Sequence, residues 1–115
     1  MNNNEVLLVC ATAGTGKTLA GILRKGRWAV RPAENAEEAL DVLARHTTAV
    51  VICERSLPDG DWRDLLHKAP RLIVTARDAD DQLWAEVLNL GGYDVLAQPF
   101  DEVEVCRVVA SAERN

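Results

Sequence analysis

The segment best suited to chemistry lies near the start of the chain and contains Gly14, Thr15, Gly16, Lys17 and Thr18. Glycines let backbone N–H groups turn toward an anion, and a lysine beside them brings a positive charge to phosphate oxygens. A threonine hydroxyl at the end of such a segment can hold Mg²⁺. These residues are candidates for a phosphate-binding site, and its ligand in this alternative is phosphate or ATP with Mg²⁺.

Five other positions, Cys10, Ala11, Glu54, Thr75 and Gln98, lie at or just after the ends of apolar runs. If those runs are strands of an open parallel sheet, the five positions share the edge where such sheets bind ligands. Cys10 and Ala11 offer no hard oxygen ligand to a metal such as Mg²⁺. We therefore expect no metal site and no catalytic residue there, and the chain is not expected to be an enzyme.

Short apolar runs alternate with segments of helical period along the whole chain. The runs predict strands at residues 6–10, 28–32, 49–53, 72–75 and 94–97. A helical pattern follows each run, and parallel neighbouring strands require such crossover helices. Right-handed crossovers then give one doubly wound α/β domain, with a five-stranded parallel sheet and five helices on its two faces. The domain is expected to fill residues 1–115, with its core at about 5–113.

Composition supports a single globular domain and excludes several classes of function. The chain has 115 residues, of which 48% are hydrophobic and 27% charged, and its formal net charge is −5. That acidic balance argues against direct nucleic-acid binding, because phosphate contacts need a basic surface. No apolar run approaches the roughly 18 residues that a membrane span needs. We expect a cytoplasmic domain that binds neither membrane nor nucleic acid.

Two pairs of side chains leave alternatives open. Cys10 and Cys53 end neighbouring strands of the predicted sheet, where they form either a redox pair or two buried thiols. Trp62 and Trp84 either anchor a partner protein or pack against neighbouring loops.

Three fragments carry a family resemblance: residues 57–60 (LPDG), Thr75 with Ala76, and residues 91–100 (GGYDVLAQPF). Together they resemble the receiver domain of bacterial two-component response regulators, over about residues 5–113. The resemblance implies a flavodoxin-like fold with strand order 2-1-3-4-5. It also implies phosphoryl transfer from a histidine kinase to an aspartate at the end of the third strand, helped by Mg²⁺ on an acidic pair and by a lysine.

The residues that would perform this chemistry differ in this chain. By the resemblance, the acidic pair falls on Cys10 and Ala11, the acceptor aspartate on Glu54 and the lysine on Gln98, whereas Thr75 stands as expected. We expect a degenerate receiver, or pseudo-receiver, that lacks aspartate phosphorylation, needs no cofactor and acts by protein–protein contact. The resemblance places that contact, with a partner protein or in a homodimer, on the fourth helix, fifth strand and fifth helix. Glu54 is either a mimic of a phosphorylated aspartate or a solvated acid.

Residues 11–18 also resemble the phosphate loop of P-loop nucleotide-binding proteins. This gives the alternative function, a small phosphate- or nucleotide-binding protein. The two hypotheses differ in where the first helix starts. Because each glycine inside a helix costs about 1 kcal/mol relative to alanine, Gly14 and Gly16 favour a loop through Gly16. An ordinary receiver would begin this helix near Thr12.

Overall fold

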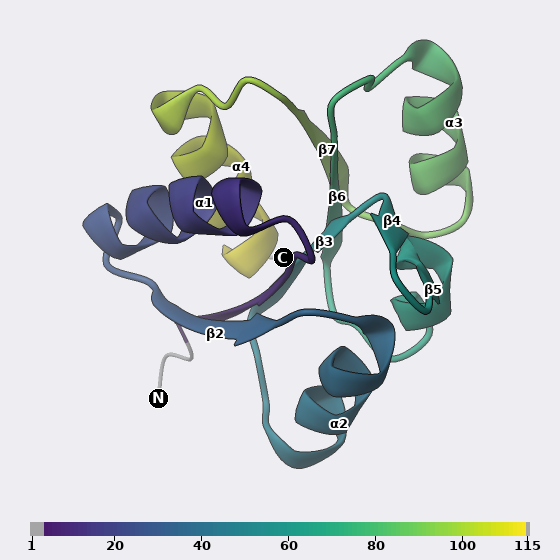
Figure 1. The fold of residues 1–115 in the computed structure, drawn as a ribbon. Helices are drawn as coiled ribbons and strands as arrows, with labels where there is room; N and C mark the ends of the chain where they lie inside the picture. Colours follow the sequence, from purple (N-terminus) through teal and green to yellow (C-terminus); the bar gives the residue numbers. More distant parts are fainter. Residues whose placement is uncertain (1–3, 115) are drawn as a thin grey trace.

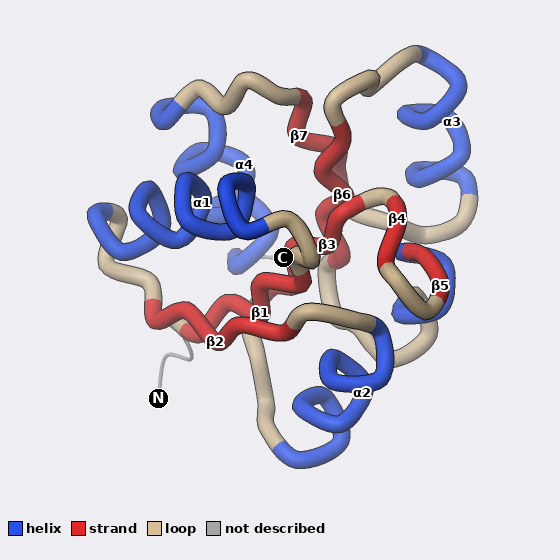
Figure 2. The backbone as a smooth tube through the Cα atoms, in the orientation of Figure 1, coloured by secondary structure: helices blue, strands red, loops and turns tan. Residues whose placement is uncertain are grey.

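The computed structural model describes residues 4–114, which form a parallel sheet with helices on both faces (Figure 1). The sheet has the order β2-β1-β3-β6-β7 and consists of β1 (Glu5–Val9), β2 (Ala29–Ala33), β3 (Val50–Glu54), β6 (Leu72–Ala76) and β7 (Asp94–Ala97). The α-helices are α1 (Ala13–Lys25), α2 (Ala36–Arg45), α3 (Asp81–Asn89) and α4 (Glu102–Arg114). Figure 2 shows the strands in red at the centre and the helices in blue around them. The predicted flavodoxin-like class with five parallel strands is confirmed.

The segment between β3 and β6 differs from the prediction. Residues there form a small antiparallel hairpin, β4 (Ser56–Leu57) with β5 (Gly60–Asp61), and then a 3-10 helix, η1 (Trp62–Leu65). The predicted five helices are therefore wrong, since the described residues contain four α-helices. The predicted order 2-1-3-4-5 is corrected to 2-1-3-6-7, because the hairpin strands come before β6 along the chain. Between the hairpin and β6 the only helical segment is the four-residue 3-10 helix η1.

Two apolar layers enclose the sheet. Along β1, Leu7 and Val9 face a core shared with α2, η1 and α3, whereas Val6 and Leu8 face a core shared with α1 and α4. These side chains alternate because successive residues of a strand point to opposite faces. Figure 1 shows α1 and α4 together on one side of the sheet. Within residues 4–114, no helix has both the length and the apolar composition needed to cross a membrane.

The first helix starts earlier than its glycines predict. Thr12 is the N-cap residue of α1, and the Gly16 N–H donates to the Thr12 carbonyl oxygen over 3.0 Å. The expected loop through Gly16 is therefore wrong, and Gly14 and Gly16 both lie inside the helix. The two residues before this helix, Ala11 and Thr12, are held by a long-range contact that is described below.

The loop after β3 is fastened to the start of α2. The Asp59 carboxylate accepts hydrogen bonds from the N–H groups of Ala36 at 2.8 Å and Glu37 at 3.0 Å. The Asn35 side chain accepts from the Glu38 N–H at 2.8 Å and so caps α2. The bonds from Ala36 and Glu37 lower the pKa of Asp59, because they stabilise its charged form. The LPDG fragment thus has a structural role in holding this loop against α2.

Candidate functional site

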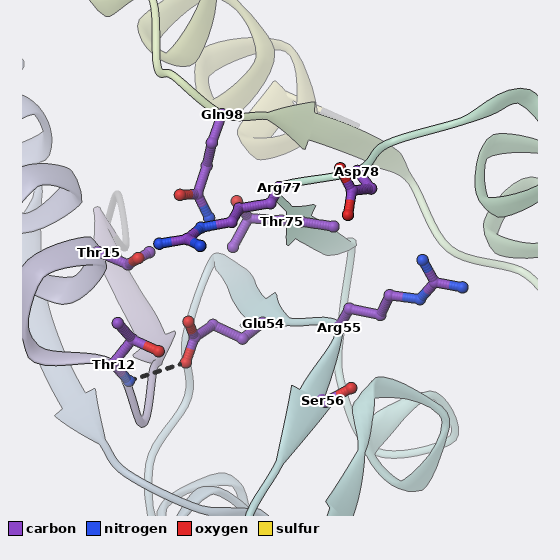
Figure 3. A pocket seen from close by; sticks show the side chains of 10 residues that line it. Thr12, Thr15, Glu54, Arg55, Ser56, Thr75, Arg77, Asp78 and Gln98 are labelled. Atoms are coloured by element: carbon purple, nitrogen blue, oxygen red, sulfur yellow. Dashed lines mark hydrogen bonds between the residues drawn. The ribbon is translucent and has the colours of Figure 1, made fainter.

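A pocket of about 300 Å³ lies at the carboxyl ends of the central strands (Figure 3). Strand register brings its side chains together. Glu54 pairs with Thr75 across β3 and β6. Ala76 pairs with Ala97 across β6 and β7, which places Gln98 just beyond this edge. The pocket is lined by Thr12, Thr15, Glu54, Arg55, Ser56, Thr75, Ala76, Arg77, Asp78 and Gln98.

Glu54 is tied to the loop between β1 and α1. Its Oε1 atom accepts hydrogen bonds from the N–H groups of Ala11, at 2.6 Å, and Thr12, at 3.1 Å. Figure 3 shows the bond from Thr12 as a dashed line. The Glu54 side chain is half-buried, and Oε2 accepts no hydrogen bond from a described residue. One carboxylate oxygen is therefore committed to the backbone and the other is available to the pocket.

Thr75 and Gln98 enter the same pocket from the ends of β6 and β7. Thr75 is 1% exposed, and its Oγ1 has no hydrogen-bond partner among the described residues. The Gln98 side-chain amide makes no hydrogen bond with a described residue either. Buried hydroxyls nearly always have a partner, so an orphaned one marks a place where a water or a ligand belongs. The predicted positions Glu54, Thr75 and Gln98 are thus brought together.

Arg77 is one of several pocket residues that sequence reasoning did not name. Figure 3 shows its side chain reaching across Thr75 toward Thr15, with the guanidinium above Glu54. Arg77 makes no ion pair or hydrogen bond with any residue in the range 4–114. The sequence feature that could have indicated Arg77 is the two-residue period of an extended strand. That period places residues 75 and 77 on the same side of the chain. The pocket therefore holds a cation close to Glu54.

Cys10 and Ala11 do not line the pocket. Ala11 takes part through its backbone N–H alone, as the donor to Glu54. Cys10 packs against the core beneath α1 and α4, whereas Cys53 belongs to the core on the opposite face of the sheet. Burial, and then the Glu54 charge, raise the pKa of Cys10 to about 12, and burial also raises the pKa of Cys53. Cys10 is thus partly buried and Cys53 fully buried, and their places on opposite faces with raised pKa values argue against a redox pair.

The glycine-rich segment contributes little to this pocket. Thr15 lines the pocket, but Gly14, Gly16, Lys17 and Thr18 do not, and Lys17 is an exposed residue of α1. A phosphate loop wraps its N–H groups around an anion before the helix begins, and here the helix has begun already at Ala13. The loop geometry assumed for nucleotide binding is wrong, and nucleotide binding itself stays a prediction.

Comparisons with known proteins agree with this geometry. No family model matches the chain. The transcriptional regulatory protein CreB of Escherichia coli is 33% identical over 123 residues, covering 100% of this chain and 53% of CreB. A two-component response regulator from Clostridium difficile superimposes with a TM-score of 0.87 at 23% identity, over 98% of each chain. Sequence similarity and fold together support a response-regulator receiver domain. The chain spans about half the length of CreB.

One of the structural neighbours contains a magnesium ion. The receiver domain of the sensor histidine kinase PA1611 from Pseudomonas aeruginosa coordinates one in its active-site cleft, and it superimposes with a TM-score of 0.86 at 20% identity over 98% of this chain and 99% of its own. In this receiver domain, Cys10 keeps its proton at neutral pH, Ala11 has no ligand atom, and one Glu54 oxygen is bound by backbone. Among residues 4–114, no three His, Cys, Asp or Glu side chains are grouped so as to hold a metal ion. These side chains do not fit a Mg²⁺ site.

Proposed function

We propose that this chain is a signalling receiver domain that has lost aspartate phosphorylation and acts by protein–protein contact. One observation carries the proposal. The carboxylate at the acceptor position, Glu54, is hydrogen-bonded by the N–H groups of Ala11 and Thr12 in the loop where the resemblance expects metal-binding acids. Two backbone N–H groups therefore bind this carboxylate where the resemblance expects acidic side chains that hold a metal ion.

The site around Glu54 is unfavourable for phosphoryl transfer for two reasons. Transfer to a carboxylate relies on cations that neutralise the charge spread over the transferring oxygens. Here Gln98, at the position of the expected lysine, is neutral, and no set of oxygen ligands stands ready for Mg²⁺. Glutamate is also one methylene longer than aspartate, so its free oxygen lies elsewhere than the oxygen of an aspartate in the same pocket. Arg77 supplies one positive charge, which does not replace both groups.

The contact face that we propose consists of α3, β7 and α4. Leu88 and Leu90, at the end of α3, are each 51% exposed, and Val103, at the start of α4, is 76% exposed. Trp84 is partly buried against the core beneath α3. Contiguous apolar surface marks sites of protein–protein contact, and these are the large hydrophobic side chains that the described residues leave exposed. The occupant of this face is a partner protein or a second copy of the chain.

The loss of phosphorylation is tested by mass spectrometry. The protein is incubated with acetyl phosphate and Mg²⁺, and its intact mass is measured. We expect the mass to stay unchanged. A phosphoryl adduct on Glu54 would overturn the proposal. The matched positive control combines Cys10→Asp, Ala11→Asp, Glu54→Asp and Gln98→Lys, which restores the implied chemistry, and this variant should gain one phosphoryl group.

The contact face is tested by changing its apolar side chains. Sedimentation equilibrium of the protein, of Leu88→Lys with Leu90→Lys, and of the control Ala44→Lys on α2 reports self-association. A dimer that the leucine variant disrupts and the control preserves identifies a second copy as the occupant. A monomer in all three points to a different partner protein. A dimer that survives the leucine change speaks against this face.

A further inference from the structure

The two helices beside the β2 edge of the sheet carry opposite charges. β2 is an edge strand, and Figure 1 shows it with α1 on one side and α2 on the other. α1 has three cationic side chains and no acidic one, whereas α2 has three acidic side chains and one cation. We propose that two copies of this chain associate side by side at the β2 edge, with α1 of each copy against α2 of the other. This inference goes beyond the proposed function, because it uses the opposite edge of the sheet and leaves the face of α3, β7 and α4 free.

Lys17 is the cation that α1 presents at this edge. It is exposed and makes no ion pair with any residue in the range 4–114. α1 packs over β1 and β2 and α4 packs over β3, so the flank of α1 away from α4 lies toward the β2 edge. Lys25 is on the α4 flank, since its Nζ atom is 3.8 Å from a Glu102 carboxylate oxygen. Because the helix has 3.6 residues per turn, Lys17 and Arg24 share the other flank, toward β2.

α2 offers an acidic groove of about 570 Å³. The groove is lined by Asn35, Glu37, Glu38, Leu40 and Asp41. The 3-10 helix η1 packs against α2 but contributes no residue to this lining, so the groove lies on the flank of α2 toward β2. Leu40 is half-buried, and Glu37 makes no ion pair within the described part of the chain. A lysine suits such a groove, because its methylene stem packs on apolar surface while its ammonium group meets the carboxylates.

The edge of β2 itself is poorly suited to an added strand. The Ala29 N–H donates to the Asn4 carbonyl oxygen, and the Ala33 carbonyl oxygen accepts from the Cys10 N–H. Residues 29 and 33 therefore bond toward β1, and the alternate residues 30 and 32 direct their backbone groups outward. Pro32 has no N–H to donate there. The second copy is thus bound through the two helices rather than by extension of the sheet.

The charges of the helices determine the symmetry of the pair. A two-fold axis parallel to β2 turns the second copy over, so that each α1 meets the other copy's α2 and both contacts are attractive. A two-fold axis perpendicular to the sheet would place α1 beside α1 and α2 beside α2, where like charges repel.

The levels of the two helices also match in this arrangement. Val9 and Ala33 pair at the ends of β1 and β2, and α1 and α2 begin shortly after them, at Ala13 and Ala36. Lys17 and Asp41 each lie just over one turn into their helix. They therefore stand at the same height on the two sides of the interface.

The experiment is a dilution series from millimolar to micromolar protein, followed by amide NMR. The starting protein carries Leu88→Lys and Leu90→Lys, so that association through the end of α3 does not contribute. We expect shifts that depend on protein concentration at residues 17–24 and 35–41. Shifts at only one of these two segments would overturn the proposal. Shifts at neither would also overturn it, and would leave the two helix faces to other proteins.

Charge exchange tests the contact between Lys17 and Asp41. Lys17→Glu and Asp41→Lys should each weaken the dimer by about tenfold or more, because both symmetry-related contacts become repulsive. The two changes combined should restore the affinity to within about twofold of the starting protein, since the pair attracts again with its charges exchanged. A combined variant that is folded by circular dichroism but does not recover would overturn the proposal.

Lys25→Glu is the matched control. It changes the net charge as Lys17→Glu does and lies on the same helix, but on the flank beside α4. We expect it to change the affinity of the dimer by less than about twofold. A loss equal to that of Lys17→Glu would show that net charge, and not the contact with α2, controls association, and would contradict the proposed interface.

Discussion

Glu54 combines a place in the pocket lining with a role in holding the backbone. Its carboxylate reaches the N–H groups of Ala11 and Thr12, so it anchors the loop between β1 and α1 across 42 and 43 residues of sequence. A side chain that binds backbone donors in this way acts as a long-range cap for the helix that follows. The position that the resemblance assigns to the phosphoryl acceptor thus has a structural role in this chain.

Replacing Glu54 should therefore cost stability. Glu54→Ala removes the acceptor for both N–H groups, and we expect the free energy of unfolding to fall by about 1–2 kcal/mol. Glu54→Gln should cost less than half as much, because its amide oxygen can still accept. Urea denaturation followed by circular dichroism measures both. Equal losses in the two variants would argue against the hydrogen bonds as the cause.

Cys10 provides a prediction about pH. Burial disfavours the thiolate, and the pKa of Cys10 is raised to about 12, so the thiol stays protonated through the usual range of pH. In Cys53→Ser with Cys106→Ser, labelling of Cys10 by a disulfide reagent should be slow at pH 8 and should keep accelerating up to pH 10. A rate that levels off below pH 9 would contradict the raised pKa.

At the scale of elements, local and long-range signals differed in how well they could be predicted. Asn35 caps α2 from the adjacent position, and its residue type and spacing from Glu38 were enough to predict this cap. Asp59 caps the same helix, and Glu54 the start of α1, from a loop or strand far away in sequence. No local pattern reveals such partners, because they meet only when the sheet assembles. The early start of α1 was missed for this reason.

Gly14 tests where α1 begins. A Cβ added at Gly14 meets nothing within 4 Å, and the residue lies in the helix. Gly14→Ala should therefore stabilise the protein by about 0.5–1 kcal/mol, because alanine loses less backbone entropy in a helix. A loop built around an anion would instead be disturbed by a side chain there. Urea denaturation decides, and a destabilised Gly14→Ala protein would contradict the helix start.

The capping of α2 by Asp59 should depend on pH. Hydrogen bonds lower the pKa of Asp59 in the folded protein, so its contribution to stability is full above its unfolded value near 4 and is lost as pH falls through the folded value. Asp59→Ala should thus be clearly less stable than the unchanged protein at pH 7 and nearly as stable at the acid end of the range. Asn35→Ala is the control, since an amide cap does not titrate. Urea midpoints across pH 2–7 measure both, and a pH-independent Asp59→Ala difference would speak against the charged cap.

For the whole molecule, the alternation of strands and helices was enough to predict the parallel sheet, because buried parallel strands form continuous apolar runs. Val50, Val51 and Ile52 are all fully buried, as such a run requires.

The pocket was only partly predictable. Strand ends indicated Glu54, Thr75 and Gln98, but the direction of the Arg77 side chain depends on how β6 ends beside α1. The 3-10 helix η1 could not be predicted, because its short segment has no helical period. It contributes Trp62 to the core, where that side chain is 1% exposed.

The two apolar layers share every strand of the sheet, so they should unfold together. Trp62 lies in the core beneath α2 and α3, and Trp28 packs against the core beneath α1 and α4. Trp28→Phe leaves fluorescence from the first layer, whereas Trp62→Phe with Trp84→Phe leaves fluorescence from the second. In urea, the fluorescence transition of each variant should coincide with its own far-UV circular dichroism transition, because a small single domain unfolds in one cooperative step. Separate transitions in either variant would show that one helix layer unfolds from the sheet before the other. The pocket at the end of the strands could then lose the residues that α1 contributes while the opposite layer stays folded.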